Sequence, residues 1–305
     1  MKGFKVINPG MHSLLQDKGR TGYHSLGITS GGAFDQYSFG WANRLCHNLD
    51  NAGCIEILVG GLILEAQVTT QIAITGADVP IKINDSTVEI WCTHNIQAGD
   101  KIAFGYATAG CRAYLAVAGG IQAPLIFNSL STVVRESLGG LTKLGTPLEK
   151  GDVLSCSSNS HSTERSVPAK YHCEFDTDTA EIRMVTGYQY EQFSQQQISQ
   201  FFATDYVISS NSDRMGYRLE GPSIEVPSCE MLSEGISLGA VQLPANGMPI
   251  ILLCDRQTIG GYPKLGSVFS QDIAKLAQMM PGKKLRFKPF SIEQAQRVLQ
   301  ESTSK

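Results

Sequence analysis

The feature that most constrains the fold is a short unit in which a glycine precedes a strand of alternating apolar and polar residues. It occurs three times, as QAGDKIAF (97–104), EKGDVLSC (149–156) and MPGKKLRF (280–287). Alternation with a period of two is typical of a strand with one buried face. A glycine at the turn allows the tight corners that a small barrel needs. We therefore expect a mainly β fold built from barrels.

A further segment, VPIKINDSTVEIW (79–91), predicts a β-hairpin that turns at Asn84 and Asp85. Helices are expected to be few and short. Apolar spacing predicts them at 34–45, 190–202, 271–282 and 291–300. The last of these is opened by a capping box of Ser291 and Gln294.

The chain has 305 residues, which favours two domains. Residues 157–180 are rich in Ser, Thr and charge and lack apolar periodicity, so they predict a linker. A shift of 178 residues aligns Asp35 with Asp213, Glu56 with Glu234, Gly61 with Gly239, and 72–75 with 250–253. This ordered agreement indicates an internal duplication. We predict a barrel at 1–160, a linker at 161–180 and a second barrel at 181–305.

Composition excludes several functional classes. Apolar residues make up 42% and charged residues 17% of the chain, as in a globular protein. A net charge of −3 without a basic stripe argues against nucleic acid as a partner, and no apolar run is long enough to span a membrane. The N-terminus has no signal-peptide pattern, and the eight cysteines form no Cys-x-x-Cys pair, so we expect a cytoplasmic protein with reduced thiols. Cys92 and His94 lack a second ligand pair, so no metal site is predicted.

Three clusters of polar residues stand out as candidate sites. The first is GITSGGAFDQYSFGWANRL, in which Asp35 and Asn43 lie on the expected helix; Asp35 is equally well explained as a helix cap. The second is SNSDRMGYRLEG, with Arg214, Tyr217 and Arg218. Surface ion pairing explains these residues, but two arginines beside a tyrosine also suit a carboxylate or a phosphate.

The third cluster follows an apolar strand at 250–253. Asp255, Gln257, Thr258, Tyr262 and Lys264 come directly after that strand, and Glu234 and Gln242 precede it. A buried strand that leads into so many polar groups must satisfy all of them, which indicates a site. The glycine pairs 119–120 and 260–261 are interpreted as barrel corners with positive φ.

Four stretches carry a resemblance to a known family. SDRMGYRLEGP, SEGISLGAVQLPANGMPIILLCDRQTIGGYPK, SLGITSGGAFD and RAYLAVAGGI resemble the motifs of the KipA / allophanate hydrolase subunit 2 family. The resemblance extends from about Lys5 to about Arg297. It implies two tandem cyclophilin-like β-barrels with a few short helices. The family's PPSGAMD appears here as TSGGAFD, and its DAQTTGGYPR/K appears as DRQTIGGYPK.

The family includes the C subunit of 5-oxoprolinase, and the resemblance implies that role here. Such a protein opens 5-oxo-L-proline to L-glutamate with ATP and Mg²⁺, together with an A subunit and a KipI-like B subunit. We expect Asp255, Glu234 and Lys264 to be catalytic. Substrate binding is expected from Arg214, Tyr217, Arg218, Gln242, Gln257, Thr258, Tyr262, Asp35 and Asn43. Since no G-x-x-x-x-G-K-[ST] loop is present, the nucleotide site is expected to be shared with a partner.

Two other interpretations remain open. The chain could be the carboxyltransferase component of a biotin-dependent system of the urea carboxylase type. It has no Met-Lys-Met attachment site, so biotin would come from a separate carrier. Alternatively, it could be a non-enzymatic, KipA-type regulator that binds a KipI-like partner, and the polar clusters would then be dispensable.

Overall fold

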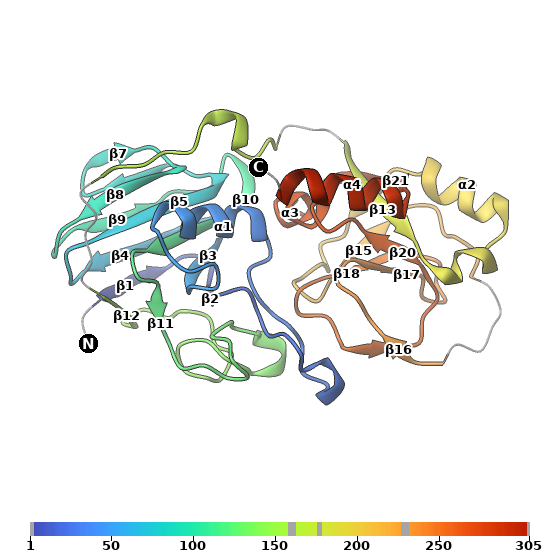
Figure 1. Cartoon of the computed structure of the whole chain (residues 1–305), viewed down its shortest axis with the longest axis horizontal. Coiled ribbons are helices and arrows are strands. Elements are labelled where there is room, and N and C mark those ends of the chain that lie inside the picture. The colour runs from blue at the N-terminus through green and yellow to red at the C-terminus, as the bar shows by residue number, and fades with distance from the viewer. Residues whose placement is uncertain (1–2, 158–162, 176–178, 227–231, 304–305) are drawn as a thin grey trace. The chain divides into compact units, whose positions relative to one another are not determined.

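The computed structural model describes residues 3–157, 163–175, 179–226 and 232–303. The chain divides into two compact units, unit 1 formed by Met1–Gly22 and Ser30–Asp176 and unit 2 by Tyr23–Thr29 and Thr177–Lys305. Strands dominate both units (Figure 1), so the predicted mainly β fold is confirmed. No helix in the described part of the chain is long and apolar enough to cross a membrane.

The described residues of unit 1 form two sheets and one α-helix. Its elements are β1 (Gly3–Pro9), β2 (His12–Gln16), α1 (Gln36–Leu45), β3 (Cys54–Leu58), β4 (Leu62–Ala66), β5 (Thr70–Asp78), β6 (Ile81–Ile83), β7 (Ser86–Val88), β8 (Cys92–Ile96), β9 (Lys101–Phe104), β10 (Ala109–Val117), β11 (Ile121–Gln122), η2 (Val134–Glu136), β12 (Val153–Cys156) and η3 (Ala169–Tyr171). The sheet orders are β11-β12-β1-β4-β9-β6-β7 and β2-β3-β10-β5-β8.

The main core of unit 1 consists of apolar side chains from both sheets, among them Phe4, Leu64 and Ile74, which are fully buried. Helix α1 packs on β5 and β10 with a second apolar cluster. There the Phe39 and Tyr114 rings meet edge to face, with their centroids 6.3 Å apart. The described residues of unit 1 therefore pack around one apolar cluster between the sheets and another beneath the helix.

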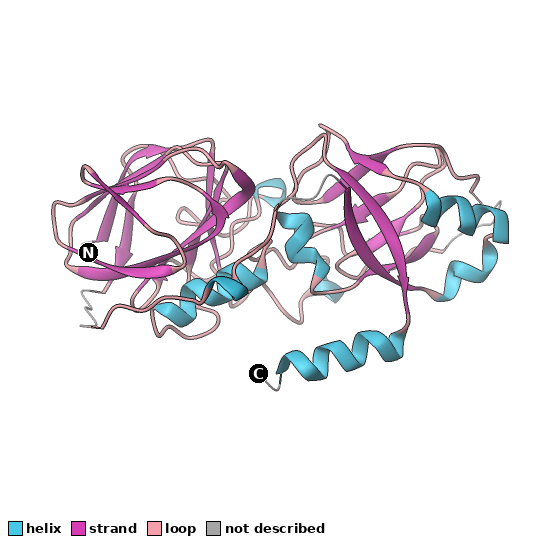
Figure 2. Cartoon of the chain, turned by 90° about the horizontal axis from the view of Figure 1, so that it is seen from above, coloured by secondary structure: helices cyan, strands magenta, loops and turns pink. Residues whose placement is uncertain are grey.

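Unit 2 is built on a closed barrel with the strand order β13-β20-β17-β18-β15-β14-β21. Its elements are η1 (His24–Leu26), β13 (Thr179–Thr186), η4 (Tyr188–Gln192), α2 (Gln195–Ala203), β14 (Tyr206–Ile208), β15 (Gly216–Glu220), β16 (Glu234–Gly235), β17 (Ala240–Gln242), β18 (Ile250–Leu252), β19 (Ile259–Gly260), β20 (Lys264–Val268), α3 (Asp272–Ala277), β21 (Lys284–Phe290) and α4 (Ile292–Thr303). Strands β16 and β19 form a separate two-stranded sheet. Stacked Phe201 and Phe287 rings join α2 to the barrel, and Figure 2 shows α4 leaving the end of β21.

The local predictions agree well with these elements. All four expected helices are present as α1 to α4. The hairpin at 79–91 is β6 paired with β7, and Asn84 at its turn has a φ of 54°. Ser291 and Gln294 form the predicted reciprocal capping bonds, at 3.0 and 3.2 Å. The three glycine-strand units are β9, β12 and β21, preceded by glycines 99, 151 and 282 with positive φ.

One local prediction is correct at the first glycine pair and wrong at the second. Gly119 and Gly120 have φ values of 84° and 74° and form the expected corner, whereas Gly260 and Gly261 do not have positive φ. Gly260 instead packs closely on a side chain, since a Cβ atom there would come within 2.6 Å of Ile236 Cδ1 and the end of that side chain would have to move. The second pair is therefore not a corner with positive φ, and Gly260 is a point of close packing.

The segment predicted as a linker contains residues that pack on unit 1. The Arg165 amide donates to Thr93 Oγ1 at 2.8 Å, and the Val167 amide donates to the Trp91 carbonyl at 2.8 Å. The His172 ring stacks on Trp91 with 4.9 Å between centroids. These contacts make 165–172 part of the first unit and not a free connector.

The short segment Tyr23–Thr29 belongs to unit 2 although its neighbours in sequence on both sides belong to unit 1. It contains η1, and its last residue, Thr29, donates a 2.6 Å hydrogen bond from Oγ1 to the Arg256 carbonyl. Unit 2 is therefore built from two separate stretches of the sequence.

Candidate functional site

A pocket of about 310 Å³ opens in unit 2 over three neighbouring barrel strands. Its floor is a cross-strand row, because Arg218 of β15 pairs with Ile250 of β18, which in turn pairs with Gln242 of β17. Directly opposite residues in a sheet direct their side chains to the same face. The pairing of the barrel strands therefore brings the side chains of Arg218 and Gln242 together, although the two residues are 24 positions apart in sequence.

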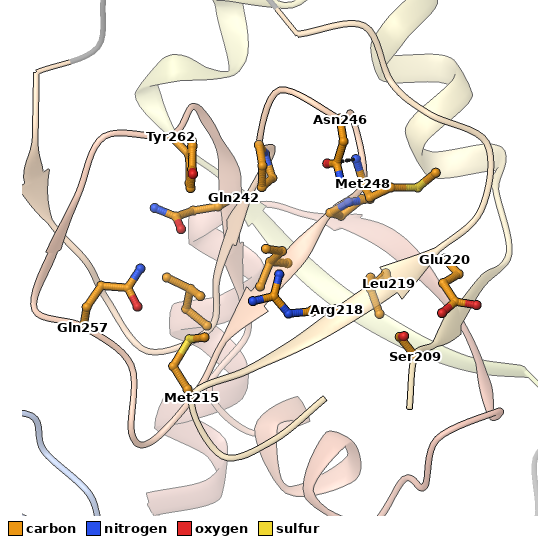
Figure 3. Close-up of a pocket in the computed structure, with 14 residues that line it drawn as sticks. Ser209, Met215, Arg218, Leu219, Glu220, Gln242, Asn246, Met248, Gln257 and Tyr262 are labelled. Atoms are coloured by element: carbon orange, nitrogen blue, oxygen red, sulfur yellow. Dashed lines mark hydrogen bonds between the residues drawn. The ribbon is translucent and has the colours of Figure 1, made fainter. Parts of the chain in front are cut away.

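Apolar and polar side chains share the lining of this pocket. Met215, Leu219, Met248 and Leu252 are among the apolar ones. Arg218, Gln242, Asn246, Gln257 and Tyr262 provide the polar groups. Figure 3 shows Arg218, Gln242 and Gln257 turned toward the same central space. A mostly apolar hollow with a few converging polar groups is the usual form of a small-molecule site.

Gln242 is the most informative residue in the lining. Its side chain is 1% exposed, and its Nε2 atom has no hydrogen-bond partner among the described residues. A buried amide donor without a partner costs about 1–3 kcal/mol. That cost is removed when a ligand supplies an acceptor, so the position of Gln242 favours a ligand that carries a carbonyl or carboxylate oxygen.

One arginine lines the pocket, and a second arginine follows it in the neighbouring polar stretch. Arg218 forms no ion pair with any carboxylate of the described residues, and Glu220 is the only acid among the described lining residues. Arg256, next to Gln257, is 5% exposed and donates to the backbone carbonyls of Ile236 and Leu253 at 3.0 and 3.2 Å. Burial lowers the pKa of Arg256 below its ordinary value, but an arginine remains charged. The pocket thus offers the Arg218 guanidinium to an anionic group of a ligand.

Asp255, expected to be catalytic, is held in a buried ion pair outside the pocket lining. Its Oδ2 accepts from Arg214 Nε at 3.1 Å and its Oδ1 accepts from Arg214 Nη2 at 3.2 Å. Asp255 is 4% and Arg214 9% exposed. This bidentate ion pair fixes the start of the polar stretch next to β15, as is typical of an ion pair with a structural role.

Glu234 and Lys264 form an ion pair that Tyr188 and Gln189 of η4 complete. The Tyr188 hydroxyl donates to Glu234 Oε2, and Gln189 Nε2 donates to Glu234 Oε1 at 2.6 Å. Burial raises the pKa of Glu234, but the hydrogen bonds from Lys264 and Tyr188 outweigh this effect, so the pKa lies below its ordinary value. Glu234 is therefore ionised at neutral pH.

Two further residues expected to bind substrate have other partners. The Tyr217 hydroxyl donates to the Met279 carbonyl at 3.2 Å, and Tyr217 does not line the pocket. Thr258 is buried and its carbonyl accepts from the Ile236 amide at 2.9 Å, next to the β16–β19 sheet. Both residues stabilise the walls around the pocket.

The remaining two expected residues, Asp35 and Asn43, lie in unit 1. Asp35 is the N-cap of α1, with its Oδ1 accepting from the amides of Tyr37 and Ser38 at 3.1 and 3.0 Å. Asn43 Nδ2 donates to the Ala52 carbonyl at 3.1 Å. The capping alternative thus accounts for Asp35, and both side chains are committed to the local fold.

Of the residues singled out by sequence, the pocket gathers Arg218, Gln242, Gln257 and Tyr262. Sequence reasoning missed Met215, Asn246, Met248, Tyr188 and Gln189, which line the pocket or complete the Glu234 cluster. Asn246 lies in the turn PANG, where its Oδ1 accepts from the Met248 amide at 3.1 Å. That turn pattern was visible in the sequence, whereas nothing in YQYEQ marked Gln189 as buried.

Comparison with known proteins gives consistent matches over nearly the whole chain. Residues 26–289 match the family described as carboxyltransferase domain, subdomain A and B. The C subunit of 5-oxoprolinase from Escherichia coli is 34% identical over 97% of this chain and 94% of its own length, and the same subunit from Haemophilus influenzae is 33% identical over 95% and 92%. The crystal structure of the Kluyveromyces lactis urea carboxylase superposes on all of this chain with a TM-score of 0.90 at 30% identity, and the match spans 29% of that larger protein.

Proposed function

Because the chain belongs to the carboxyltransferase subdomain A and B family, we propose that it is the C subunit of a 5-oxoprolinase and that the pocket in unit 2 binds 5-oxo-L-proline. Two relatives, each named as the C subunit of a 5-oxoprolinase, match it over more than nine-tenths of its length. The fold alone would not identify a substrate. The proposal therefore rests on the pocket.

The observation that carries the proposal concerns Gln242. Its Nε2 has no hydrogen-bond partner among the described residues, and it lies in a pocket that Arg218 also lines. 5-Oxoproline has a carboxylate and a lactam carbonyl on one small ring. The guanidinium of Arg218 suits the carboxylate, and the Gln242 amide suits the lactam oxygen. Gln257, whose amide makes no hydrogen bond to a described residue, and Tyr262 would orient the ring.

Opening a lactam requires activation of the amide. We propose that ATP, together with Mg²⁺, activates it by phosphorylating the amide oxygen. Cationic side chains would stabilise the charge that develops; Arg218 and Lys264 are the available ones. Among the described residues, no group of three or more His, Cys, Asp or Glu side chains could hold a metal ion. Because the sequence has no G-x-x-x-x-G-K-[ST] loop, we place the nucleotide on or against a partner, the KipI-like B subunit or the A subunit.

The test is reconstitution of the complex. The purified chain, the A and B subunits, and all combinations of the three are assayed for ATP-dependent release of glutamate from 5-oxoproline. We expect negligible release from this chain alone and turnover only with all three. Glutamate release by the single chain would refute the dependence on partners. A stable, complete complex without any release would refute the proposed function.

A second candidate follows from the match to urea carboxylase, which covers the whole of this chain. In that case the pocket would hold the acceptor of a carboxyl group brought by a separate biotin carrier. Transfer of the carboxyl group from free carboxybiotin to a candidate acceptor, which yields biotin and the carboxylated acceptor, distinguishes this reaction because it needs no ATP. A regulator would show neither activity and would bind only its KipI-like partner.

A further inference from the structure

Gln189 is a buried amide whose hydrogen bonds join three residues, two of them distant in sequence. The residue is 1% exposed and lies in η4. Its Oε1 accepts from the Lys264 backbone amide at 2.7 Å. Its Nε2 donates to Glu234 Oε1 at 2.6 Å and to the Tyr188 hydroxyl at 2.9 Å. Burial of an amide is unfavourable unless such bonds compensate for it, so this side chain is fixed in one orientation.

The residues that Gln189 holds adjoin the pocket. Lys264 of β20 is the direct cross-strand partner of Gln242, whose Nε2 has no partner among the described residues. Glu234 of β16 pairs with Gly260 of β19, and a Cβ atom on Gly260 would lie 3.1 Å from that same Nε2. The Glu234–Lys264 pair is thus one step along the sheets from the pocket floor.

Unit 1 contains a similar cluster of a carboxylate, a tyrosine and a cation, but there the cluster is buried. Glu56 there accepts from the Tyr114 hydroxyl at 2.7 Å and lies 3.8 Å from Arg112, but its side chain is only 4% exposed. In unit 2 the Glu234 side chain is 30% exposed. Of these two clusters, only the one in unit 2 therefore brings a carboxylate, a cation and a tyrosine to solvent, which is what a site requires.

We propose that Gln189 is a positioning residue that holds Glu234 and Lys264 at the edge of the substrate pocket without touching the substrate itself. The expected effect on kcat rests on the proposed function. The expected effect on the pKa of Glu234 needs only the contacts between Gln189, Glu234 and Lys264. Lys264 from β20 and Tyr188 from η4 are the titratable groups that face Glu234.

The test compares Gln189→Met with Gln196→Met, a matched change at an exposed glutamine of α2 whose side chain makes no hydrogen bond to a described residue. In the reconstituted complex we expect Gln189→Met to lower kcat by roughly 10- to 100-fold, the scale of one hydrogen bond to a charged group. KM should change much less, and the acid limb of the pH profile should move to higher pH. Gln196→Met should behave as wild type in each measurement.

A second readout does not depend on the reaction. The pKa of Glu234 is followed by ¹³C NMR in the isolated chain, with Glu234→Gln used for assignment. Loss of the bond from Gln189 should raise this pKa relative to wild type and to Gln196→Met. An unchanged pKa overturns the inference even if the chain is not a 5-oxoprolinase. An active wild-type complex with unaltered kcat in Gln189→Met overturns it as well.

A folding control separates positioning from loss of stability. Gln189→Met leaves the Lys264 backbone amide without its acceptor, which can destabilise the barrel. Gln189→Glu keeps that acceptor and the shape of the side chain but places a second carboxylate against Glu234, which should raise the pKa of the pair. If Gln189→Met does not fold, Gln189→Glu decides the question by the same kcat and pKa measurements.

Discussion

Replacing Asp255 by alanine should damage the stability of unit 2 far more than a surface mutation would. The carboxylate makes two bonds to Arg214, at 3.1 and 3.2 Å, and the two side chains are 5% and 10% exposed. At 3.1 Å and an effective dielectric constant of about 20, the attraction is of order 5 kcal/mol before desolvation is counted. Removing one partner leaves the arginine without its buried carboxylate, which costs about 3–5 kcal/mol.

Thermal and urea unfolding of the purified chain measure this effect. A loss of about 3–5 kcal/mol corresponds to a fall in the midpoint of roughly 10–20 °C for a unit of this size. Asp255→Asn keeps the shape but removes the charge, so it should be destabilised in the same direction by a smaller amount. The double variant Arg214→Met/Asp255→Leu replaces the pair by apolar groups and should recover most of the stability.

The sequence indicated a different role for Asp255, as an acid or base, and the kinetics of Asp255→Asn distinguish the two. A structural pair predicts reduced stability with kcat within a few-fold of wild type at a temperature where the variant is folded. Unaltered stability together with a fall in kcat of roughly 100-fold or more would refute the structural assignment and return Asp255 to the catalytic group.

Further expectations concern the pocket, the pH dependence and the thiols. Gln242→Leu should leave the melting temperature unchanged or raise it, since it removes a buried donor without a partner among the described residues, yet it should abolish the stabilisation of the chain by added 5-oxoproline in a thermal shift assay. The fold lowers the pKa of Glu234 from its ordinary 4.5. Its contribution to stability should therefore be complete above about pH 4.5 and should be lost as the pH falls through the lowered pKa. In urea unfolding measured against pH, the Glu234→Gln variant should not show this loss of stability. Burial raises the pKa of the Cys46 and Cys173 thiols to about 12, so both should react slowly with a thiol reagent at pH 8 until the chain is unfolded. Cys46 is buried and Cys173 is half-buried, and rapid labelling of Cys46 in the folded chain would contradict its burial.

The sequence predicted the strands and helices well because their signals are local. Alternating residues after a glycine, a capping box at Ser291 and a turn at Asn84 each specify geometry within a few residues, and the structure has all of them. The packing of 165–172 on unit 1 was missed because its contacts are formed with Trp91 and Thr93, about 70 residues away. A polar composition alone cannot distinguish a docked segment from a linker.

For the candidate site, the stretch that the sequence singled out contributes Gln257 and Tyr262 to the pocket lining, but the sequence did not indicate where each neighbouring side chain lies. Asp255 and Gln257 are two positions apart, yet the first is locked to Arg214 and the second lines the pocket. Both residues lie in the irregular segment between β18 and β19, where no periodic pattern in the sequence specifies the direction of a side chain. Gln189 gave no signal in sequence, because a glutamine is ordinarily exposed and its burial is set by partners 45 and 75 residues further along.

The membership of Tyr23–Thr29 in unit 2 has a consequence for any attempt to divide this protein into two pieces. A gene cut at the change of unit near residue 176 would yield a C-terminal fragment without the threonine that bonds to the Arg256 carbonyl. Its N-terminal counterpart would carry a seven-residue loop whose contacts are missing. The halves therefore cannot be exchanged between relatives as independent modules. A chimaera should take 23–29 and 177–305 from the same parent, and a successful split requires a peptide of that loop supplied in trans.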